Sequence, residues 1–591
     1  MQAIPDPSIK LVIMNRLFQT SIPRFRMIRV VVLLFFVGFS PLGCATADGP
    51  RLPRNHVISA ANPHAARAGL AMLRAGGGAV DAAIAAQAVL TLVEPQSSGI
   101  GGGAFLLHYS KRDRAVEAYD GRETAPAGAG PELFLGANKM PLKFYDAVIG
   151  GRSVGAPGVL RMLELAHGEH GRLPWARLFE PAIALAENGF EISPRLHYFI
   201  GRAKGLERTA AARRYFFTQV GEPKPAGNRL VNAEFAATLR IIAKHGADGL
   251  YRGPLAREIV DAVRGAVANP GALSLADLRD YRAVKRRALC RPYRGWNVCT
   301  MPPPTSGGIT TLQILGLLER FDLSRLKPGS VRAVHLISEA SRLAYADRAA
   351  YIADADFVSV PVEGLLRRNY LAARSELISA ARSMGRAVAG APGRRKSEIP
   401  PVSDAIELPS TSHLSVVDSH GNAVSMTSSV ENIFGSRLMV GGFMLNNQLT
   451  DFSFRPEING RKVANRVQPG KRPRSSMSPT IVLDGDGRFV VALGSPGGSR
   501  IIGYVARALI AALDWRMGLA DAFALPNHVN RNGPTDLEKG SALRAIAPGL
   551  EALGHEVRIR GLTTGLHGVR ATPDGYDAAA DPRREGVALG D

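Results

Sequence analysis

The stretch Thr411-Ser-His-Leu-Ser-Val-Val-Asp418 and the stretch Ala423-Val-Ser-Met-Thr-Ser-Ser429 are joined by the turn Ser419-His-Gly-Asn422. Apolar and polar residues alternate along both stretches, and this period of two predicts a pair of β-strands. A similar pattern returns in Thr480-Ile-Val-Leu483 and Phe489-Val-Val-Ala-Leu493, on either side of a short Asp/Gly turn. We therefore predict two β-hairpins in this part of the chain, the first of which begins with a threonine.

Segments with helical spacing lie on both sides of these hairpins. The predicted helices are Pro63–Ala75, Ala79–Val93, Val331–Ala353 and a fourth from about 500 to about 513. The first two end at a run of glycines and at a proline, which are common helix stop signals. A further strand is predicted at Ala104–Tyr109. Strands bounded by helices on both sides predict a layered α/β sandwich.

Composition excludes several classes of protein. Of 591 residues, 46% are hydrophobic, so the chain can bury a sizeable core. Lys and Arg number 73 against 51 Asp and Glu, a net charge of +22. These basic residues are spread along the chain without a nucleic-acid-binding motif, so we expect no nucleic-acid partner. The chain also lacks the zincin, P-loop and dinucleotide-binding motifs, so those enzyme classes are not leading hypotheses.

An apolar run near the N-terminus, Arg29-Val-Val-Val-Leu-Leu-Phe-Phe-Val-Gly-Phe39, follows two further arginines. It is too short to span a bilayer, whereas a basic, then apolar, then small-residue order is typical of a secretory signal. We expect residues 1–44 to be a signal peptide with its true start at Met27, and the protein to be periplasmic or secreted. Leu42-Gly43-Cys44 also resembles a lipoprotein cleavage box, apart from Pro41, and would attach a lipid to Cys44. The alternative is a buried apolar helix.

The two remaining cysteines, Cys290 and Cys299, flank a predicted hairpin. No CxxC pair is present, so structural zinc is not expected. A two-residue turn at Arg294-Gly295 places Cys290 opposite Cys299 on a non-hydrogen-bonded rung, where Cα atoms lie about 4.5 Å apart. That separation suits a disulfide. In an exported protein we expect a cross-strand disulfide; the alternative is two free buried thiols.

Residues 385–410 are rich in Gly, Pro, Arg, Lys and Ser, and their lack of periodicity predicts an exposed linker. This linker runs directly into Thr411. If the bond between Ser410 and Thr411 were cut, Thr411 would carry both a hydroxyl and a free α-amine. A threonine hydroxyl needs an adjacent base, and a terminal amine of pKa about 7.7–8.0 can accept its proton near neutral pH. One residue would then supply nucleophile and base; the alternative is an ordinary strand threonine.

Eight motifs, in order along the chain, extend this hypothesis. They are Val93–Gly103, Asp120–Pro126, Met301–Gly308, Thr411–Asp418 with Gly421-Asn422, Leu445–Phe452, Lys471–Thr480, Gly494–Arg500 and Asp581–Arg584. Together they resemble the gamma-glutamyltranspeptidase (glutathione hydrolase) family from about residue 55 to the end of the chain. The resemblance implies an N-terminal-nucleophile hydrolase with a four-layer αββα sandwich. It also implies a precursor that cuts itself between Ser410 and Thr411, giving a large subunit of residues 45–410 and a small catalytic subunit of residues 411–591.

The same resemblance implies the roles of the catalytic residues. Thr411 would be the nucleophile, and Ser429, which stands where the family carries a threonine, would assist it. The backbone N–H groups of Gly497 and Gly498 would stabilise the oxyanion. His413 lies two residues along the strand from Thr411, so we interpret it as structural.

The implied substrate-binding residues surround a γ-glutamyl group. They are Arg122, Ser475 and Ser476 for the α-carboxylate, Gln448 and Asp451 for the α-ammonium, and Glu431, at a position where many members carry Asn. Lid-less bacterial members resemble this chain in using Glu there. No cofactor or metal is implied.

The expected activity is therefore that of a self-processing gamma-glutamyltransferase and glutathione hydrolase. Its partners would be γ-glutamyl compounds such as glutathione and, in the mature heterodimer, its own two chains. The protein would be attached to a membrane only through a lipid on Cys44. The segment from Asp451 to Lys471 is short and lacks the lid-loop tyrosine of longer members, which predicts an open pocket. Alternatives are a related acylase that acts on glutaryl or other amides, and a non-catalytic envelope protein. A Ser324-Arg-Leu-Lys327 match to SxxK lacks its KTG partner and is ascribed to chance.

Overall fold

The computed structural model describes residues 52–393, 396–403, 405–408 and 410–591. The expected signal peptide, with Met27 and Cys44, lies outside these residues. Within the described ranges, no helix combines the length and the apolar character that crossing a bilayer requires.

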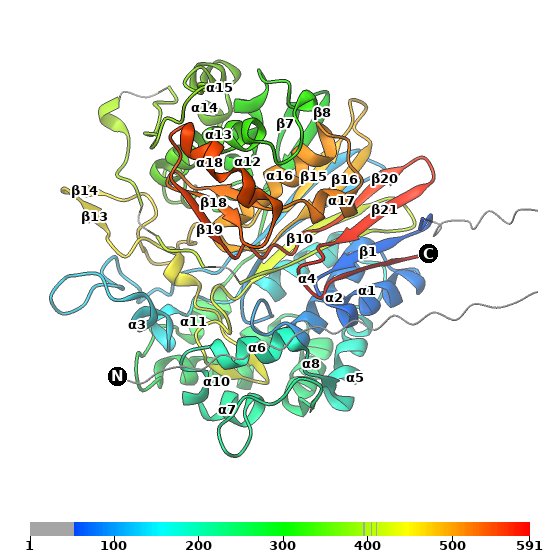
Figure 1. The fold of residues 1–591 in the computed structure, drawn as a ribbon. Coiled ribbons are helices and arrows are strands. Elements are labelled where there is room, and N and C mark those ends of the chain that lie inside the picture. The colour runs from blue at the N-terminus through cyan, green and yellow to red at the C-terminus, as the bar shows by residue number, and fades with distance from the viewer. Residues whose placement is uncertain (1–51, 394–395, 404, 409) are drawn as a thin grey trace, which may run out of the picture. The chain divides into compact units, whose positions relative to one another are not determined.

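Two antiparallel sheets stack face to face in the described part of the chain (Figure 1). The first sheet has the order β22 (Val587–Gly590), β1 (Val57–Ala60), β9 (Ser412–Val417), β10 (Ala423–Ser429), β2 (Gly103–Ser110), β3 (Ala115–Gly121) and β6 (Val284–Arg287). The second has the order β21 (Gly575–Ala580), β20 (His567–Thr572), β16 (Phe489–Gly494), β15 (Thr480–Leu483), β8 (Trp296–Thr300) and β7 (Leu289–Tyr293). The two predicted hairpins are confirmed as β9–β10 and β15–β16, which lie near the middle of the two sheets.

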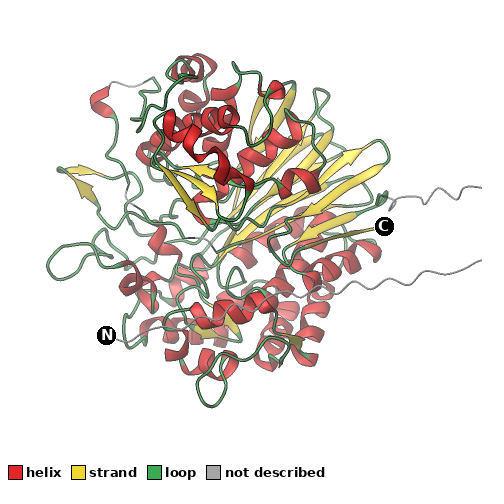
Figure 2. Cartoon of the chain, viewed as in Figure 1, coloured by secondary structure: helices red, strands yellow, loops and turns green. Residues whose placement is uncertain are grey.

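Helices cover the outer face of each sheet, so the layers follow the order αββα, and this expected architecture is confirmed (Figure 2). Helices on the side of the first sheet are α1 (Pro63–Arg74), α2 (Ala79–Val93), α4 (Val159–His170), α5 (Glu180–Asn188), α8 (Ala233–His245) and α10 (Gly253–Arg264). Helices on the side of the second sheet are α12 (Gly307–Leu318), α13 (Val331–Tyr351), α16 (Ile501–Leu513) and α17 (Leu519–Ala524). The four predicted helices are among them, with ends that differ by one or two residues.

Shorter elements complete the fold. The remaining helices are α3 (Phe144–Val148), α6 (Pro194–Arg202), α7 (Ala210–Phe216), α9 (Asp248–Tyr251), α11 (Leu275–Asp280), α14 (Val362–Leu366), α15 (Arg368–Ser375) and α18 (Ala547–Ala552). The remaining strands are β4 (Phe190–Glu191), β5 (Arg229–Leu230), β11 (Met439–Val440), β12 (Phe443–Met444), β13 (Glu457–Ile458), β14 (Arg461–Lys462), β17 (His528–Asn530), β18 (Thr535–Glu538) and β19 (Val557–Arg560).

Strand β9 is buried on both faces because its side chains alternate between two cores. Leu414 and Val416 belong to the core shared with the α1–α2 layer. Val417 faces the core between the sheets, where the Ser415 hydroxyl also donates to the His567 carbonyl at 3.3 Å. Every residue of β9 is buried. A strand held from both sides in this way gives the residue before it, Thr411, a fixed position.

Asp418 ties the turn of this hairpin to a helix. Its Oδ1 accepts hydrogen bonds from the backbone N–H groups of His420 and Asn422, at 2.9 and 3.0 Å. Its Oδ2 accepts from the N–H of Ala79 at 3.1 Å, at the first residue of α2. A carboxylate is stabilised by the free N–H groups and the dipole of a helix N-terminus. The turn therefore fixes β9 and β10 against the helical layer.

The hairpin β7–β8 has the register predicted from its turn. Cys290 pairs with Cys299 and Tyr293 with Trp296. The Cα atoms of the two cysteines lie 4.0 Å apart, and the sulfurs form a disulfide. The bond joins edge strand β7 to its neighbour in the second sheet.

We expect neither Cys290 nor Cys299 of the purified protein to react with an alkylating reagent until the protein is reduced, as judged by intact mass. Replacing both residues with serine should lower the apparent Tm by a few degrees, because closing a loop of this size contributes about 2–3 kcal/mol. Unmodified protein measured with a reductant is the control, because it loses the bond without any substitution. Alkylation of both cysteines without a reductant would contradict the disulfide.

Candidate active site

One cavity gathers nearly all of the residues that the sequence singled out. Its lining includes Arg122, Ser410, Thr411, Ser429, Glu431, Gln448, Asp451, Ser475, Ser476 and Gly498. Gly497, the neighbour of Gly498, is not in the lining. Only about 20 Å³ of the cavity is open, little more than one water molecule needs. The reason is that Glu407 and Leu408, from the segment before Thr411, also occupy the site.

The Thr411 hydroxyl lies against the carbonyl of the residue that precedes it. It donates a hydrogen bond to the Ser410 oxygen and lies 3.3 Å from the Ser429 hydroxyl. Ser429 donates to the same Ser410 oxygen at 2.8 Å. The register of the hairpin explains this convergence, because Ser412 pairs with Ser428 and so brings the next residue of β10 beside Thr411. The Thr411 hydroxyl therefore faces a carbonyl that a second hydroxyl already polarises.

A glycine turn between β16 and α16 approaches the same segment. Gly497 and Gly498 have φ angles of +142° and +59°, which favour glycine. A methyl group added to Gly498 would lie 2.6 Å from the Leu408 carbonyl oxygen and 3.0 Å from that of Glu407. The absence of a side chain thus lets two backbones touch at the entrance to α16, where helix geometry leaves N–H groups free for an anion.

Arg122 and Asp451 form a buried ion pair on the other side of the cavity. The Arg122 Nη2 lies 2.5 Å from the Asp451 Oδ2, to which Gln448 Nε2 also donates at 2.9 Å. Arg122 is further held by the carbonyls of Pro473 and Arg474, both at 3.0 Å. These residues come from the end of β3, from the 3₁₀ turn Gln448–Asp451 and from the loop before β15.

Three buried atoms of this group have no hydrogen-bond partner within the described residues: Arg122 Nη1, Gln448 Oε1 and Asp451 Oδ1. Arg122 Nη1 has only a 3.5 Å contact with a carboxylate oxygen of Glu123. Buried polar atoms are nearly always paired in folded proteins. One donor and two acceptors facing a cavity therefore suit a ligand that carries both an anionic and a cationic group.

Burial weakens the acidity of the carboxyl groups around the pocket. It raises the pKa of Asp451 to about 6, with Arg122 acting against the rise and Glu407 adding to it. It raises the pKa of Glu123 to about 8, and it also raises that of Glu431 well above its usual value, with the charge of Asp451 adding to the effect. Asp451 is therefore the acid among these three that ionises most readily near neutral pH.

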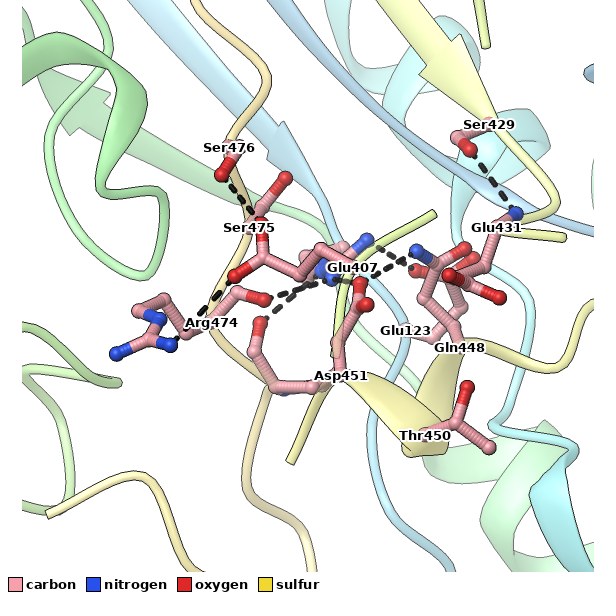
Figure 3. Close-up of polar contacts among 12 residues, drawn as sticks. Glu123, Glu407, Ser429, Glu431, Gln448, Thr450, Asp451, Arg474, Ser475 and Ser476 are labelled. Atoms are coloured by element: carbon pink, nitrogen blue, oxygen red, sulfur yellow. Dashed lines mark hydrogen bonds and ion pairs between the residues drawn. The ribbon is translucent and has the colours of Figure 1, made fainter. Parts of the chain in front are cut away.

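Ser475 and Ser476 line the cavity from the loop before β15, and Figure 3 shows them beside Glu407. The Ser475 hydroxyl accepts from the N–H of Met477 at 3.1 Å, and its carbonyl accepts from the N–H of Ser306 at 2.7 Å. The Ser476 hydroxyl donates to the Glu407 carboxylate. Ser476 is thus already bound to a carboxylate in this structure.

His413 is buried and has structural partners. Its Nδ1 lies 2.8 Å from the Thr427 hydroxyl and its Nε2 3.1 Å from the Ser415 hydroxyl. Burial holds its pKa well below the usual value, so the ring is neutral. Both ring nitrogens bond within the hairpin, and neither is recorded in contact with Thr411.

Sequence reasoning missed three charged residues of the cavity region: Glu407, Arg348 and Arg474. The expectation of an exposed linker over 385–410 is wrong at its end, because Glu407 and Ser410 are buried. A Gly/Pro-rich composition reports a lack of regular structure, and it does not reveal that the end of the segment occupies a cavity. Arg474 lies inside the motif Lys471–Thr480, but only the tertiary structure brings it near Glu407.

A buried threonine at the start of a central strand in an αββα sandwich is the arrangement of the N-terminal-nucleophile hydrolases, and the chain has this fold. The family model described as Gamma-glutamyltranspeptidase matches residues 65–591. The chain therefore belongs to the gamma-glutamyltranspeptidase family.

Individual relatives agree with this assignment. The chain is 35% identical to the glutathione hydrolase proenzyme of Bacillus subtilis, over 91% of this chain and 92% of the relative. It is also 35% identical to the acylase ACY 1 proenzyme of Pseudomonas sp. strain SE83, over 89% of this chain and 92% of the relative. Among solved structures, cephalosporin acylase from Bacillus halodurans is similar with a TM-score of 0.80 and 26% identity, covering 94% of this chain and 99% of that chain.

We expect Gly498→Ala to slow the appearance of two chains by about 100-fold or more. The new methyl group would meet the Leu408 carbonyl at 2.6 Å in a backbone conformation that alanine rarely adopts, and it would displace both the segment and the N–H groups of the turn. Processing would be followed on denaturing gels after translation. Gly485→Ala, at a position with open space around it, should process normally. Normal processing of Gly498→Ala would exclude the close approach.

Proposed function

We propose that this protein is a self-processing gamma-glutamyltransferase and glutathione hydrolase whose nucleophile is Thr411. The observation that carries the proposal is the Thr411 hydroxyl held against the Ser410 carbonyl, with Ser429 on the same oxygen. Family membership supports the proposed activity, and the geometry supports the assignment of Thr411 as the nucleophile.

In the precursor, the Thr411 Oγ attacks the Ser410 carbonyl carbon. The bond from that carbon to the Thr411 nitrogen breaks, and the nitrogen takes the proton released by the hydroxyl. The resulting ester is hydrolysed by water, which leaves a carboxylate on Ser410 and a free α-amine on Thr411. The freed segment must then leave the cavity, because Glu407 and Leu408 occupy it.

In the mature enzyme, the α-amine of Thr411 acts as the base for its own hydroxyl. A terminal amine with a pKa of about 7.7–8.0 is partly neutral at pH 7 to 8. The hydroxyl attacks the γ-glutamyl carbonyl, the proton passes to the leaving amine, and water or an acceptor amine resolves the acyl-enzyme. The N–H groups of Gly497 and Gly498 stabilise the oxyanion; one such donor is worth about 2.7–4 kcal/mol.

The pocket residues divide between the two charges of the γ-glutamyl group. Arg122, with Ser475 and Ser476, receives the α-carboxylate, and Asp451 with Gln448 receives the α-ammonium. The unpaired Arg122 Nη1, Asp451 Oδ1 and Gln448 Oε1 support this division. Glu431 accepts from the N–H of Leu408 at 3.2 Å and so borders the acyl side of the pocket.

The two chains of the mature protein would stay together as a heterodimer. In the first sheet, β9 and β10 from the small chain lie between β1 and β2 from the large chain. In the second sheet, β15 from the small chain pairs with β8 from the large chain. Cutting one peptide bond leaves these ladders intact.

Glutathione and its conjugates are the proposed substrates, in line with the glutathione hydrolase proenzymes that the chain is similar to. Export to the periplasm or beyond, with or without a lipid on Cys44, is proposed from the N-terminal sequence alone. A second candidate is the hydrolysis of glutaryl-type amides. The equal similarity to an acylase proenzyme and the fold likeness to a cephalosporin acylase favour it.

We expect the purified protein to run as two chains, and Thr411→Ala to remain a single chain without activity. The alanine variant keeps the fold but has no hydroxyl to attack the Ser410 carbonyl. N-terminal sequencing of the smaller band should read Thr-Ser-His-Leu. Thr411→Ser is the matched control, because it keeps a hydroxyl and should still cut. Normal cutting of Thr411→Ala would refute the assignment of the nucleophile.

A second prediction concerns pH. Asp451 must be ionised to hold an α-ammonium, and its pKa of about 6 in the uncleaved chain is raised partly by Glu407; it should therefore fall below 6 once that segment leaves. As pH drops through this range, donors with an α-ammonium lose affinity, whereas glutaryl donors do not. The ratio of kcat/KM for γ-glutamyl-p-nitroanilide to that for glutaryl-p-nitroanilide should fall several-fold between pH 7 and pH 4, with most of the fall below pH 6. Both donors depend equally on the ionisation of the Thr411 α-amine, so this effect cancels in the ratio. A ratio that does not change with pH would contradict the proposed role of Asp451.

A further inference from the structure

Two arginines hold the Glu407 carboxylate inside the cavity. Arg348 from α13 and Arg474 from the loop before β15 both reach it, the latter at 3.5 Å. The Ser476 hydroxyl donates to the second carboxylate oxygen and accepts from Arg348 Nη2 at 2.8 Å. Figure 3 shows Glu407 between Arg474 and Ser476. We call Arg348, Arg474 and Ser476 the arginine bay.

The arginine bay is built for a carboxylate. All three of its residues are buried, as is Glu407. Burial by itself raises the pKa of Glu407, but Arg348 and Arg474 outweigh it, so that the pKa is lowered and the group is ionised. Arg348 Nε is fixed by the Ser306 hydroxyl at 2.7 Å, which orients its guanidinium toward the cavity.

Cutting the chain would leave this bay without its anion. Within the described residues, Glu407 is the only acidic group at ion-pair distance from Arg348 or Arg474. Arg474 Nε also lacks a hydrogen-bond partner in this part of the chain. Removing one member of a buried ion pair is strongly unfavourable, because the remaining charge has lost its hydration. The mature pocket would therefore favour another anion at this place.

Glu407 also lies on the acyl side of the bond that is cut, three residues before Ser410. The acyl part of a substrate enters the space that this segment leaves. We propose that Glu407 is a placeholder, and that in the mature enzyme the carboxylate of the acyl donor takes its place in the arginine bay. There it binds Arg348 and Arg474 in addition to Arg122, Ser475 and Ser476, which line the same cavity. This inference rests on the proposed function and adds two substrate-binding residues to it. The ligand is a carboxylate, either the α-carboxylate of a γ-glutamyl amide or the terminal carboxylate of a glutaryl amide.

The first test compares matured enzymes. Arg474→Leu keeps an apolar side chain at this position and removes the charge, so KM for both γ-glutamyl- and glutaryl-p-nitroanilide should rise at least tenfold with kcat within about threefold. Arg466→Leu removes the same charge from the same loop without contact to Glu407 and should leave both KM values unchanged. A rise for one donor only identifies that donor's carboxylate as the ligand. Unchanged KM values for both donors would overturn the proposal.

The second test needs neither maturation of Arg474→Leu nor catalysis. In the uncleaved Thr411→Ala protein Glu407 fills the bay, whereas in Thr411→Ala/Glu407→Ala the bay is vacant and large enough for acetate. Sodium acetate should raise the Tm of the double variant by several degrees over sodium chloride of equal concentration, and should leave the single variant unchanged. Equal effects on both variants would overturn the proposal. Because no substrate is turned over, the result stands even if the mature enzyme hydrolyses neither donor and the proposed function fails.

Discussion

The hydrogen bond from the Thr411 hydroxyl to the carbonyl of its own preceding residue is the constraint around which the molecule is arranged. A hydroxyl meets that carbonyl only if the backbone is held firmly on both sides of the bond. After the bond, β9 is fixed by its ladder with β1 and β10 and by cores on both faces. Before the bond, Glu407 is fixed by its ion pairs and hydrogen bonds. The sandwich and the buried charges thus both hold the Thr411 hydroxyl against the Ser410 carbonyl.

The cavity concentrates charged groups that a protein interior usually excludes. Burying an ion pair gains little stability against an apolar replacement, so the Arg122–Asp451 and Arg348–Glu407 pairs are better explained by recognition than by folding energy. The two pairs are coupled, because burial raises the pKa of Asp451 and the charge of Glu407 adds to that rise. In the proposed maturation, departure of the segment before Thr411 would change the electrostatics of the pocket together with its volume.

Much of this could be predicted from the sequence, because local patterns report local structure. Period-two alternation located β9, β10, β15 and β16, and an Arg-Gly turn determined which residues pair in the Cys290–Cys299 hairpin. The resemblance of the motifs to those of the gamma-glutamyltranspeptidase family identified Arg122, Asp451 and Thr411 as candidate site residues. Ser476 was found in this way, but the two arginines of the bay were missed because Arg348 and Arg474 are far apart in sequence and no spacing signal connects them. The linker was misjudged at Glu407 because a composition without periodicity is typical of exposed segments, and only an ion pair with distant arginines makes this end buried.

The alternation of strands from both sides of the Ser410–Thr411 bond within one sheet has a consequence for how activity arises. Such a sheet forms most directly while the polypeptide is continuous, so in the proposed maturation folding precedes cutting. The free α-amine of Thr411, the proposed base, would then exist only in molecules whose sandwich has closed correctly. In this architecture, activity would arise only in correctly folded molecules, and a misfolded molecule would stay inactive.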